Sequence, residues 1–297
     1  MEEYTIRPGG ALRRAEEPGE GTRLVRMTEE EFAALPQEMP HRRRLERSLE
    51  TVRYCKAESF GGSAQGVLRL PGRGEEAPLT FGFYLWRREL LLIGGGEALD
   101  RRLEGLRDTL PGDGSPRHLL LAVLEHLIGG DLLYLQEVEE GLEEIEEGLL
   151  QRVPEHFYET VIRRGKELSA LHAYYEQLID MGDHLSGEAA GEEGRFWQLF
   201  TNRAERLHNH VEMLREYLRQ IRELYQTQID VQQNRVMTIL TVVTTLFLPL
   251  SLIAGWYGMN FPNIPILHQR WGYAAVAAVS AGIVAAEILY FKRKKML

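Results

Sequence analysis

The stretch MTILTVVTTLFLPLSLIAGW (residues 237–256), followed by Tyr257-Gly258-Met259-Asn260-Phe261, decides the fold. Between Arg235 and Arg270 no Asp, Glu, Lys or Arg occurs for 34 residues. Twenty apolar residues in a helix cross the ~30 Å hydrocarbon core of a bilayer. The stretch therefore predicts a transmembrane helix, and residues 237–260 are taken as that helix together with the segment that ends it.

A second apolar stretch lies at residues 271–291, interrupted only by Glu287. Residues 292–297 begin with four basic residues and form a tail that the positive-inside rule keeps in the cytosol. The chain begins Met1-Glu2-Glu3-Tyr4, with no basic and apolar leader that would export the long N-terminal part. We expect a hairpin in the plasma (inner) membrane, with residues 261–270 as an external loop and both termini in the cytosol.

The charge divides with this topology. The net charge is −9; residues 237–297 contain five basic residues and one acidic residue, which leaves −13 on residues 1–236. An acidic cytosolic part argues against a nucleic-acid partner, because phosphate binding needs a basic face, and favours a cation. The single cysteine, Cys55, excludes an intramolecular disulfide or a thiolate cage, and its surroundings predict a buried position in a reducing compartment.

Residues 1–114 predict a cytosolic α/β domain. Short β-rich runs suggest strands at 23–27, 52–60, 65–70, 79–86 and 89–93, and helical signals lie at 29–35 and 100–110. Gly94-Gly95-Gly96 follows a strand, but no Lys-Ser/Thr comes after it as a phosphate-binding loop requires, so a turn is expected.

Residues 115–194 predict long helical arms. Ser115 is placed to cap a helix that has Pro116 at its first position. An apolar seam then recurs every three or four residues, at Ile128, Leu132, Leu135, Val138, Leu142, Ile145 and Leu149. The glutamates between 137 and 147 form either a solvated face or a cation-collecting surface. A return helix is expected at 155–184, with a loop at 186–194.

Residues 195–236 predict a cytosolic stalk helix, because neither Pro nor Gly occurs from Arg195 to Leu248 and the helix can continue unbroken to Trp256. An apolar seam lies on one face, at Leu207, Val211, Leu214, Leu218, Ile221 and Tyr225. About 200° away a second stripe repeats at spacings of four and three: Glu223, Thr227, Asp230, Asn234, Met237, Thr241, Thr244, Leu248 and Ser251.

This second stripe, which we call the axial stripe, suggests a water path. Polar side chains in a spanning helix normally face a bundle interior or water, and two helices per chain are too few to enclose one, so an oligomer is expected. At one level of the predicted water path, either Leu240 or Thr241 could be the residue that faces the path. Glu223 and Asp230 are candidate cytosolic ion sites. The alternative for the threonines is helix–helix packing.

The end of the first span resembles the CorA family of divalent-cation channels, whose mark is Tyr-Gly-Met-Asn-Phe at this position. The resemblance covers the whole layout: acidic α/β domain, helical arms, stalk helix, two spans and lysine-rich tail. It implies a funnel-shaped homopentamer that transports Mg²⁺, and also Co²⁺ or Ni²⁺, with Gly258, Met259 and Asn260 at the outer mouth. The family's pore pattern supports Asn234, Met237, Leu248, Ser251 and Asn260 as pore-lining residues.

The chemistry of such a pore depends on ion hydration. Mg²⁺ holds its octahedral water shell tightly, so a pore that accepts the hydrated ion avoids a large dehydration penalty. Rings of Asn260 and Asn234 amides would contact the metal through its waters, with Met237 and Leu248 as apolar constrictions and Thr241, Thr244 and Ser251 as wet layers between them. No cofactor besides the transported ion is expected, and no nucleophile–base pair suggests an enzyme.

Two departures from the family keep alternatives open. The connector at 261–269 contains no carboxylate, and the segment Phe196-Trp-Gln-Leu-Phe-Thr-Asn-Arg203 lacks the acidic signature that holds regulatory Mg²⁺ between subunits in many members. A zinc importer of the ZntB branch is therefore a second hypothesis, although that branch typically has isoleucine where this chain has Met259. A membrane-anchored scaffold or sensor is a third. His208 and His210 point in different directions on one helix and are expected to be surface residues.

Overall fold

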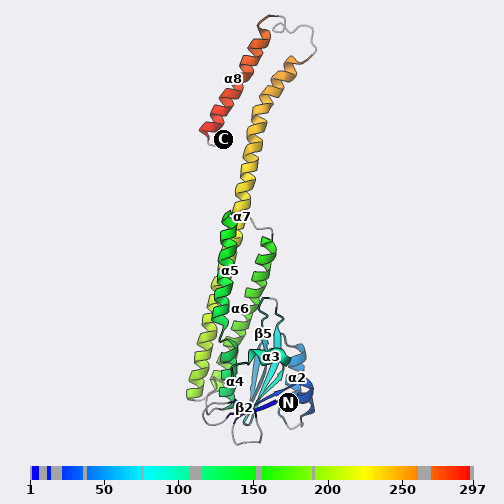
Figure 1. The fold of residues 1–297 in the computed structure, drawn as a ribbon, viewed down its shortest axis with the longest axis vertical. Helices are drawn as coiled ribbons and strands as arrows, with labels where there is room; N and C mark the ends of the chain where they lie inside the picture. The colour runs from blue at the N-terminus through cyan, green and yellow to red at the C-terminus, as the bar shows by residue number, and fades with distance from the viewer. Residues whose placement is uncertain are drawn as a thin grey trace. The chain divides into compact units, whose positions relative to one another are not determined.

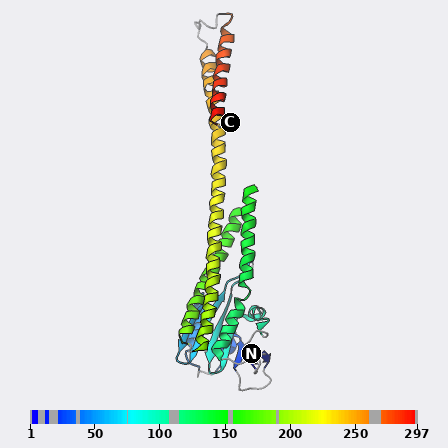
Figure 2. The same cartoon turned by 90° about the vertical axis from the view of Figure 1, so that its left-hand side faces the viewer.

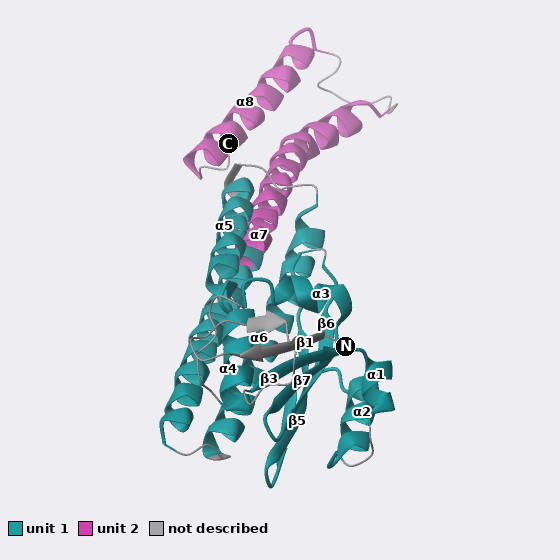
Figure 3. Ribbon diagram, turned by 60° about the horizontal axis from the view of Figure 1, so that its bottom comes forward, with its two compact units in different colours: residues 1–222 teal, residues 223–297 magenta. Residues whose placement is uncertain are grey.

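The fold is described from a computed structural model. The residues described are 2–6, 12–14, 22–35, 39–74, 76–106, 115–151, 156–188, 191–259 and 269–294. The chain divides into two compact units, residues 1–222 and residues 223–297, which Figure 3 distinguishes by colour. Each unit is considered by itself.

Unit 1 contains a mixed seven-stranded sheet with the order β2-β1-β3-β7-β6-β5-β4. Its strands are β1 (Glu2–Ile6), β2 (Leu12–Arg14), β3 (Arg23–Met27), β4 (Lys56–Phe60), β5 (Ser63–Leu70), β6 (Leu79–Trp86) and β7 (Glu89–Gly94). Only β3 and β7 run parallel; the other neighbouring strands are antiparallel. The side chains of β5, β6 and β7 are mostly buried on both faces, which requires helices on both sides of the sheet.

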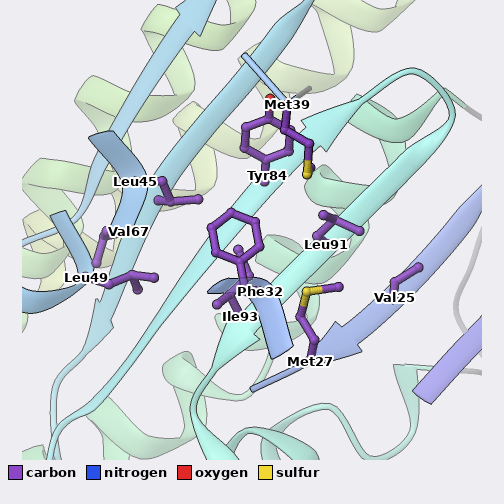
Figure 4. Packing of buried hydrophobic residues seen from close by; sticks show 10 residues of the cluster. All are labelled: Val25, Met27, Phe32, Met39, Leu45, Leu49, Val67, Tyr84, Leu91 and Ile93. Carbon is purple, nitrogen blue, oxygen red and sulfur yellow. The ribbon is translucent and has the colours of Figure 1, made fainter. Parts of the chain in front are cut away.

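One face of the sheet is covered by α1 (Glu29–Ala34) and α2 (Arg42–Thr51). A capping box fixes the start of α1: Glu31 N donates to Thr28 Oγ1, and Thr28 N donates to the Glu31 carboxylate. Figure 4 shows the cluster of ten buried residues to which these helices contribute, including Phe32 from α1, Leu45 and Leu49 from α2, and Tyr84 from the sheet. The Tyr84 hydroxyl donates to the Pro40 carbonyl at 2.7 Å, which satisfies the one polar atom of that side chain.

Three further helices contact the sheet: α3 (Gly96–Arg102) on β6, α4 (Pro116–Leu127) on β6 and β7, and α6 (Phe157–Glu188) on β4. Ser115 caps α4 by accepting from His118 N at 3.2 Å, with Pro116 at the first helical position. The helix stops at Ile128, and a turn through Gly129-Gly130 leads into α5 (Asp131–Gln151). Two consecutive glycines make this break in the helix inexpensive.

Three long helices, α5, α6 (Phe157–Glu188) and the first part of α7 (Glu192–Tyr257), run side by side in unit 1 (Figures 1 and 2). The predicted α7 seam is buried from Leu207 to Ile221, together with Trp197 and Phe200 near the start of the helix. A Cβ at Gly182 of α6 would lie 2.4 Å from Thr201 Oγ1 of α7, so the glycine permits the close approach of the two helices.

Unit 2 consists of the remainder of α7 and of α8 (Gly272–Arg293). Helix α7 continues through Pro249, and Figure 1 shows that its orange end bends away from the line of the rest. Three helical stretches of the described chain are long and apolar enough to cross a membrane. Half of the most apolar window in Pro116–Leu149 is buried inside unit 1, against 6% for the windows in α7 and α8. We therefore assign α7 and α8 as the membrane-spanning helices. The stretch Pro116–Leu149 belongs to the core of unit 1.

The predicted fold class is confirmed: an α/β N-terminal part is followed by long helices and two apolar C-terminal helices. Several details were wrong. The strand predicted at 52–60 begins at Lys56, since Val52 still ends α2, and the helix predicted from residue 100 begins at Gly96 and ends at Arg102. Strands β1 and β2 and helix α2 were not predicted. Leu132 is 52% exposed and does not belong to the seam, because at 100° per residue it lies about 90° from the buried side chains of the same helix α5.

Candidate functional site

Every residue of the axial stripe, from Glu223 to Ser251, is exposed in the single chain. Met237 is 64% exposed and Leu248 is 69% exposed. Leu240 and Thr241 are both exposed, so both alternatives for that layer stay open. On the part of α7 between residues 223 and 257 only Val242 is buried. Among the described residues of its own unit, the stripe is thus left uncovered.

The threonine hydroxyls of this helix already donate hydrogen bonds. Thr238 Oγ1 donates to Asn234 O, Thr241 Oγ1 to Met237 O and Thr244 Oγ1 to Leu240 O, each at 2.8 Å. Thr227 makes the same bond to Glu223 O at 2.9 Å. A hydroxyl has one proton and two lone pairs. Once the proton is engaged by the helix backbone, the oxygen can offer its remaining lone pairs to a donor outside the helix.

The outer end of α7 is closed by a glycine. Gly258 N donates to Ala254 O at 2.9 Å, and a Cβ at Gly258 would lie only 2.7 Å from that oxygen. A side chain there would therefore clash with the last turn of the helix. Met259 follows and is 47% exposed. Asn260, predicted to form the mouth ring, lies outside the described residues, as do residues 261–268 of the connector.

Aromatic residues flank the predicted spans. Trp256 at the end of α7 and Trp271 and Tyr273 at the start of α8 are all exposed. Such side chains favour the interface between lipid and water. Near the other end of α8, the Glu287 Oε2 atom is buried and has no hydrogen-bond partner within the described part of the chain.

The two predicted cytosolic ion residues, Glu223 and Asp230, are exposed on α7. Asp230 Oδ1 accepts from Gln226 Nε2 at 3.1 Å on the same helix. Among the described residues, no group of three His, Cys, Asp or Glu is arranged to hold a metal ion. A cation at Glu223 or Asp230 would therefore need further ligands, such as water, carbonyl oxygens or groups from other copies of the chain.

The segment Phe196–Arg203 has an inner and an outer side. Trp197 and Phe200 are buried, whereas Leu199 and Asn202 face outward, and Arg203 Nη2 donates to Gly129 O at 3.3 Å. The outward positions are those at which the resemblance noted in the sequence leads us to expect carboxylates. In this chain an apolar side chain and a neutral amide occupy them.

The glutamates of α5 divide into two groups. Glu139 lies 3.4 Å from His210 Nε2, and the Glu146 carboxylate accepts from the Tyr217 hydroxyl. Glu137, Glu140, Glu143, Glu144 and Glu147 are exposed. The two α7 histidines are half-buried rather than fully exposed as expected, with the His208 ring centroid 4.3 Å from that of His172 on α6. The period of the helix could not reveal this pairing across two helices.

A buried polar cluster links the β5–β6 loop to the helices, and the sequence analysis missed it. Asp131 is buried and forms an ion pair with Arg73, while the Tyr175 hydroxyl donates to Asp131 Oδ2 at 2.7 Å. Burial raises the pKa of the Asp131 carboxyl, and the Arg73 guanidinium opposes that shift. Arg73 also lies 4.8 Å from the Tyr134 ring centroid. The one available signal was Asp131 after Gly129-Gly130, a typical helix start.

The single cysteine is buried as predicted. Cys55 is free, and burial raises the pKa of its thiol from 9.0 to about 12. The thiol therefore stays protonated and unreactive at neutral pH.

Comparison with known proteins identifies relatives. Residues 83–293 match the family profile described as CorA-like Mg²⁺ transporter protein. The cobalt/magnesium transport protein CorA of Thermotoga maritima is 27% identical over 184 residues, which is 61% of this chain and 52% of that relative. The chain thus matches about half the length of this curated relative.

Solved structures show the same fold. The CorA magnesium transporter of Methanocaldococcus jannaschii superposes with a TM-score of 0.81 at 19% identity, over 98% of this chain and 97% of the other. The ZntB cytoplasmic domain of Vibrio parahaemolyticus superposes with a TM-score of 0.60 at 14% identity, over 77% of this chain and 98% of the domain.

Proposed function

The chain belongs to the family of CorA-like Mg²⁺ transporter proteins, and on that premise we propose that it conducts hydrated divalent cations, Mg²⁺ foremost, through a homopentameric pore lined by α7. The observation that carries this proposal is the axial stripe. It is exposed along its whole length in the single chain, and its membrane part contains no charged side chain. A polar stripe of that kind in lipid requires either water or other copies beside it.

The stripe has the chemistry that a hydrated cation needs. The waters around Mg²⁺ direct their protons outward, so the shell is recognised by hydrogen-bond acceptors. Thr241 and Thr244 offer acceptors, since their own protons are bonded to Met237 O and Leu240 O. We propose that Asn234 adds an amide ring at the cytosolic end and Asn260 one at the mouth. Met237 and Leu248 then form apolar layers that gate by dewetting, and Ser251 lines the path beyond Leu248.

We place the pore in the plasma (inner) membrane, with both termini in the cytosol and the Gly258-Met259-Asn260 motif outside. The basic residues at the C-terminal end of α8 support this orientation. A pentamer follows from the family, in which each chain supplies one pore-lining helix.

Zinc is the second candidate ion. The structural likeness to a ZntB cytoplasmic domain favours it only at the level of fold, and Met259 argues for the magnesium branch. A scaffold without transport is the remaining alternative. A pure anchor would have no use for polar side chains at Thr241, Thr244 and Ser251 and would tolerate leucine there.

Ion flux into proteoliposomes containing the purified full chain tests the proposal. We expect uptake of Mg²⁺, with Co²⁺ and Ni²⁺ also admitted and Zn²⁺ slower. The matched control is the Thr241→Leu/Thr244→Leu/Ser251→Leu variant, which should assemble but lose flux. Zn²⁺ uptake in preference to Mg²⁺ would assign the zinc branch, and equal flux in the leucine variant would remove the stripe from the pathway.

A further inference from the structure

The first observation is an unpaired acidic face on α5. Glu137, Glu140, Glu144 and Glu147 recur at spacings of three, four and three, and all are exposed. At 100° per residue they lie about 190° from the buried side chains of Leu135, Val138, Leu142 and Leu149. Within the described part of the chain these four carboxylates have no ion pair or hydrogen bond. Like charges at these spacings repel one another, so the face is destabilising unless cations approach it.

The second observation is a basic groove between α6 and α7 in the same unit. Its volume is about 520 Å³, and its cationic side chains are Lys166, Arg215, Arg219 and Arg222. Gly165 leaves room for this arrangement, since a Cβ there would lie 2.9 Å from Arg222 Nη2. Among the described residues, Arg215 and Arg219 form ion pairs only with Glu212 and Glu216, one turn away on their own helix. Lys166 and Arg222 form no ion pair with the residues described.

We propose that the basic groove of one copy receives the acidic face of α5 from the neighbouring copy. The inference rests on the homo-oligomer of the proposed function and adds to it the contact that joins the cytosolic parts. Within one chain the pairing is impossible, because the acidic face points away from the helices on which α5 packs.

The helix directions favour a second copy as the occupant. Glu139 contacts His210 and Glu146 contacts Tyr217, so α5 and α7 run in the same direction with a constant offset of 71 residues. Rotation about an axis parallel to these helices preserves both direction and level. The neighbour's Glu144 is then level with Arg215, and its Glu147 is level with Leu218 and next to Arg219.

The charge spacing is compatible with this arrangement. Glu140, Glu144 and Glu147 are separated by four and three residues, and so are Arg215, Arg219 and Arg222, which lie one helical turn (four residues) beyond the level of those glutamates. Each carboxylate can therefore meet the arginine one turn above its own level, because an arginine side chain is long enough to span about 6 Å of rise. A small anionic ligand would account for the groove but would leave the acidic face unexplained.

Cross-linking of the full chain in detergent tests the contact. The reporter protein carries Glu147→Cys on the acidic face and Ile162→Cys in the groove, and it is treated with a short bismaleimide. Cys55 is silent because it is buried. We expect a ladder of covalent oligomers on a denaturing gel. In the matched control Ile162→Cys is replaced by Asp183→Cys, an exposed site about 31 Å further along α6, and we expect at least tenfold less product.

Charge reversal in the reporter protein then separates this contact from simple proximity. Arg219→Glu/Arg222→Glu should lower the yield about tenfold, and so should Glu140→Arg/Glu144→Arg. Combining all four substitutions should restore the yield to within about twofold. The inference is overturned if the control pair cross-links equally, if neither reversal lowers the yield, or if the combined swap stays as low as its parts. If only the groove variant lowers the cross-linking yield, the inference is also overturned, and the groove binds a small anion or another partner instead.

Light scattering and Mg²⁺ flux on the same preparations distinguish the two proposals. A monomeric wild-type protein without flux would remove the proposed function. An oligomer with normal flux but no cross-link between residues 147 and 162 would remove only the contact inferred here.

Discussion

Helix α7 contains two regions of similar helical period and opposite burial. Below residue 222 its apolar seam, exemplified by Val211, Leu214 and Ile221, is buried against helices of the same chain. Above residue 222 only Val242 is buried, and large apolar side chains such as Leu248 and Leu252 are about 70% exposed. The first region folds with partners from its own chain. The second presents side chains whose partners are lipid, water or other copies, since exposed apolar area of that size is unfavourable in water.

The largest expected effect concerns thiol accessibility. Burial raises the pKa of the Cys55 thiol to about 12, so at pH 8 its thiolate is far scarcer than in a free cysteine. Thr244→Cys, on the axial stripe, should react with a charged thiol reagent at least about a hundredfold faster than Cys55. Labelling of Cys55 should stay slow at neutral pH, because the thiol is buried and protonated.

The control for this experiment is Ile239→Cys, which is exposed on the opposite side of the span. A charged reagent should not reach it through lipid. Equal labelling at residues 239 and 244 would mean that water reaches the axial stripe no better than the opposite side of the helix. The two regions of α7 would then differ only in how deeply their side chains are buried.

Asn260→Ala should lower divalent flux by a factor of about 100 or more and leave assembly intact, because the amide is proposed to contact hydrated ion rather than to pack. Asn263→Ala, in the connector three residues further on, is the matched control and should conduct normally. Flux through proteoliposomes and particle size together give the result. Wild-type flux in the Asn260 variant would remove the mouth ring.

Leucine-to-alanine substitutions in the two regions of α7 should lower the free energy of unfolding by different amounts. Leu214→Ala removes a fully buried side chain and should lower the free energy of unfolding by about 2–5 kcal/mol. Leu248→Ala removes an exposed one and should change the unfolding of unit 1 by less than about 0.5 kcal/mol. Urea titration followed by tryptophan fluorescence of the buried Trp197 measures both. Equal losses would show that unit 1 depends on the spans for its stability.

Met237→Ser should increase basal leak about three- to tenfold, since a polar side chain wets an apolar constriction. Met213→Ser, exposed on α7 in unit 1, serves as the control and should leave the leak unchanged. The leak is measured as Mg²⁺ efflux from proteoliposomes without an applied membrane potential. An unchanged rate would place the narrowest layer elsewhere, with Leu248 as the next position to test.

The smallest effect is expected when Mg²⁺ is added and proteolysis of the cytosolic part is followed. By the resemblance noted in the sequence, Leu199 and Asn202 stand where carboxylates were expected to hold regulatory Mg²⁺, and hard cations need such oxygens. Millimolar Mg²⁺ should therefore slow proteolysis of the cytosolic part by less than about twofold, with residual protection weakened by salt. A sharp protection that persists at high salt would reveal a tight site and a different alignment of residues 196–203.

The parts of the fold that the sequence predicted are those with long-range periodicity. The 3.6-residue seams of α5 and α7 and the apolar runs of the spans extend over many turns, so single exceptions do not hide them. Helix α2 was missed because its sequence, RRRLERSLET, supplies only two buried side chains, Leu45 and Leu49. The seam position Leu132 was wrong because spacings of three and four residues also admit a side chain about 90° from the centre of the buried face of α5.

The candidate site divides in the same way. The axial stripe is a property of one helix and could be predicted from spacing. The pairing of Asp131 with Arg73 and Tyr175, and that of His208 with His172, depend on which elements meet in space. No local pattern encodes such contacts, so only the structure could supply them.

The backbone-bonded threonines of α7 have one further consequence, which concerns the sign of a passing ion. Because the protons of Thr241 and Thr244 are already committed to helix carbonyls, these hydroxyls cannot turn to solvate an anion without breaking a bond in the helix. A hydrated chloride, whose outer waters present oxygens, would meet few donors along these layers. In the proposed pore, such a lining would reject anions by the polarity of its hydrogen bonds, without a charged side chain between residues 237 and 256.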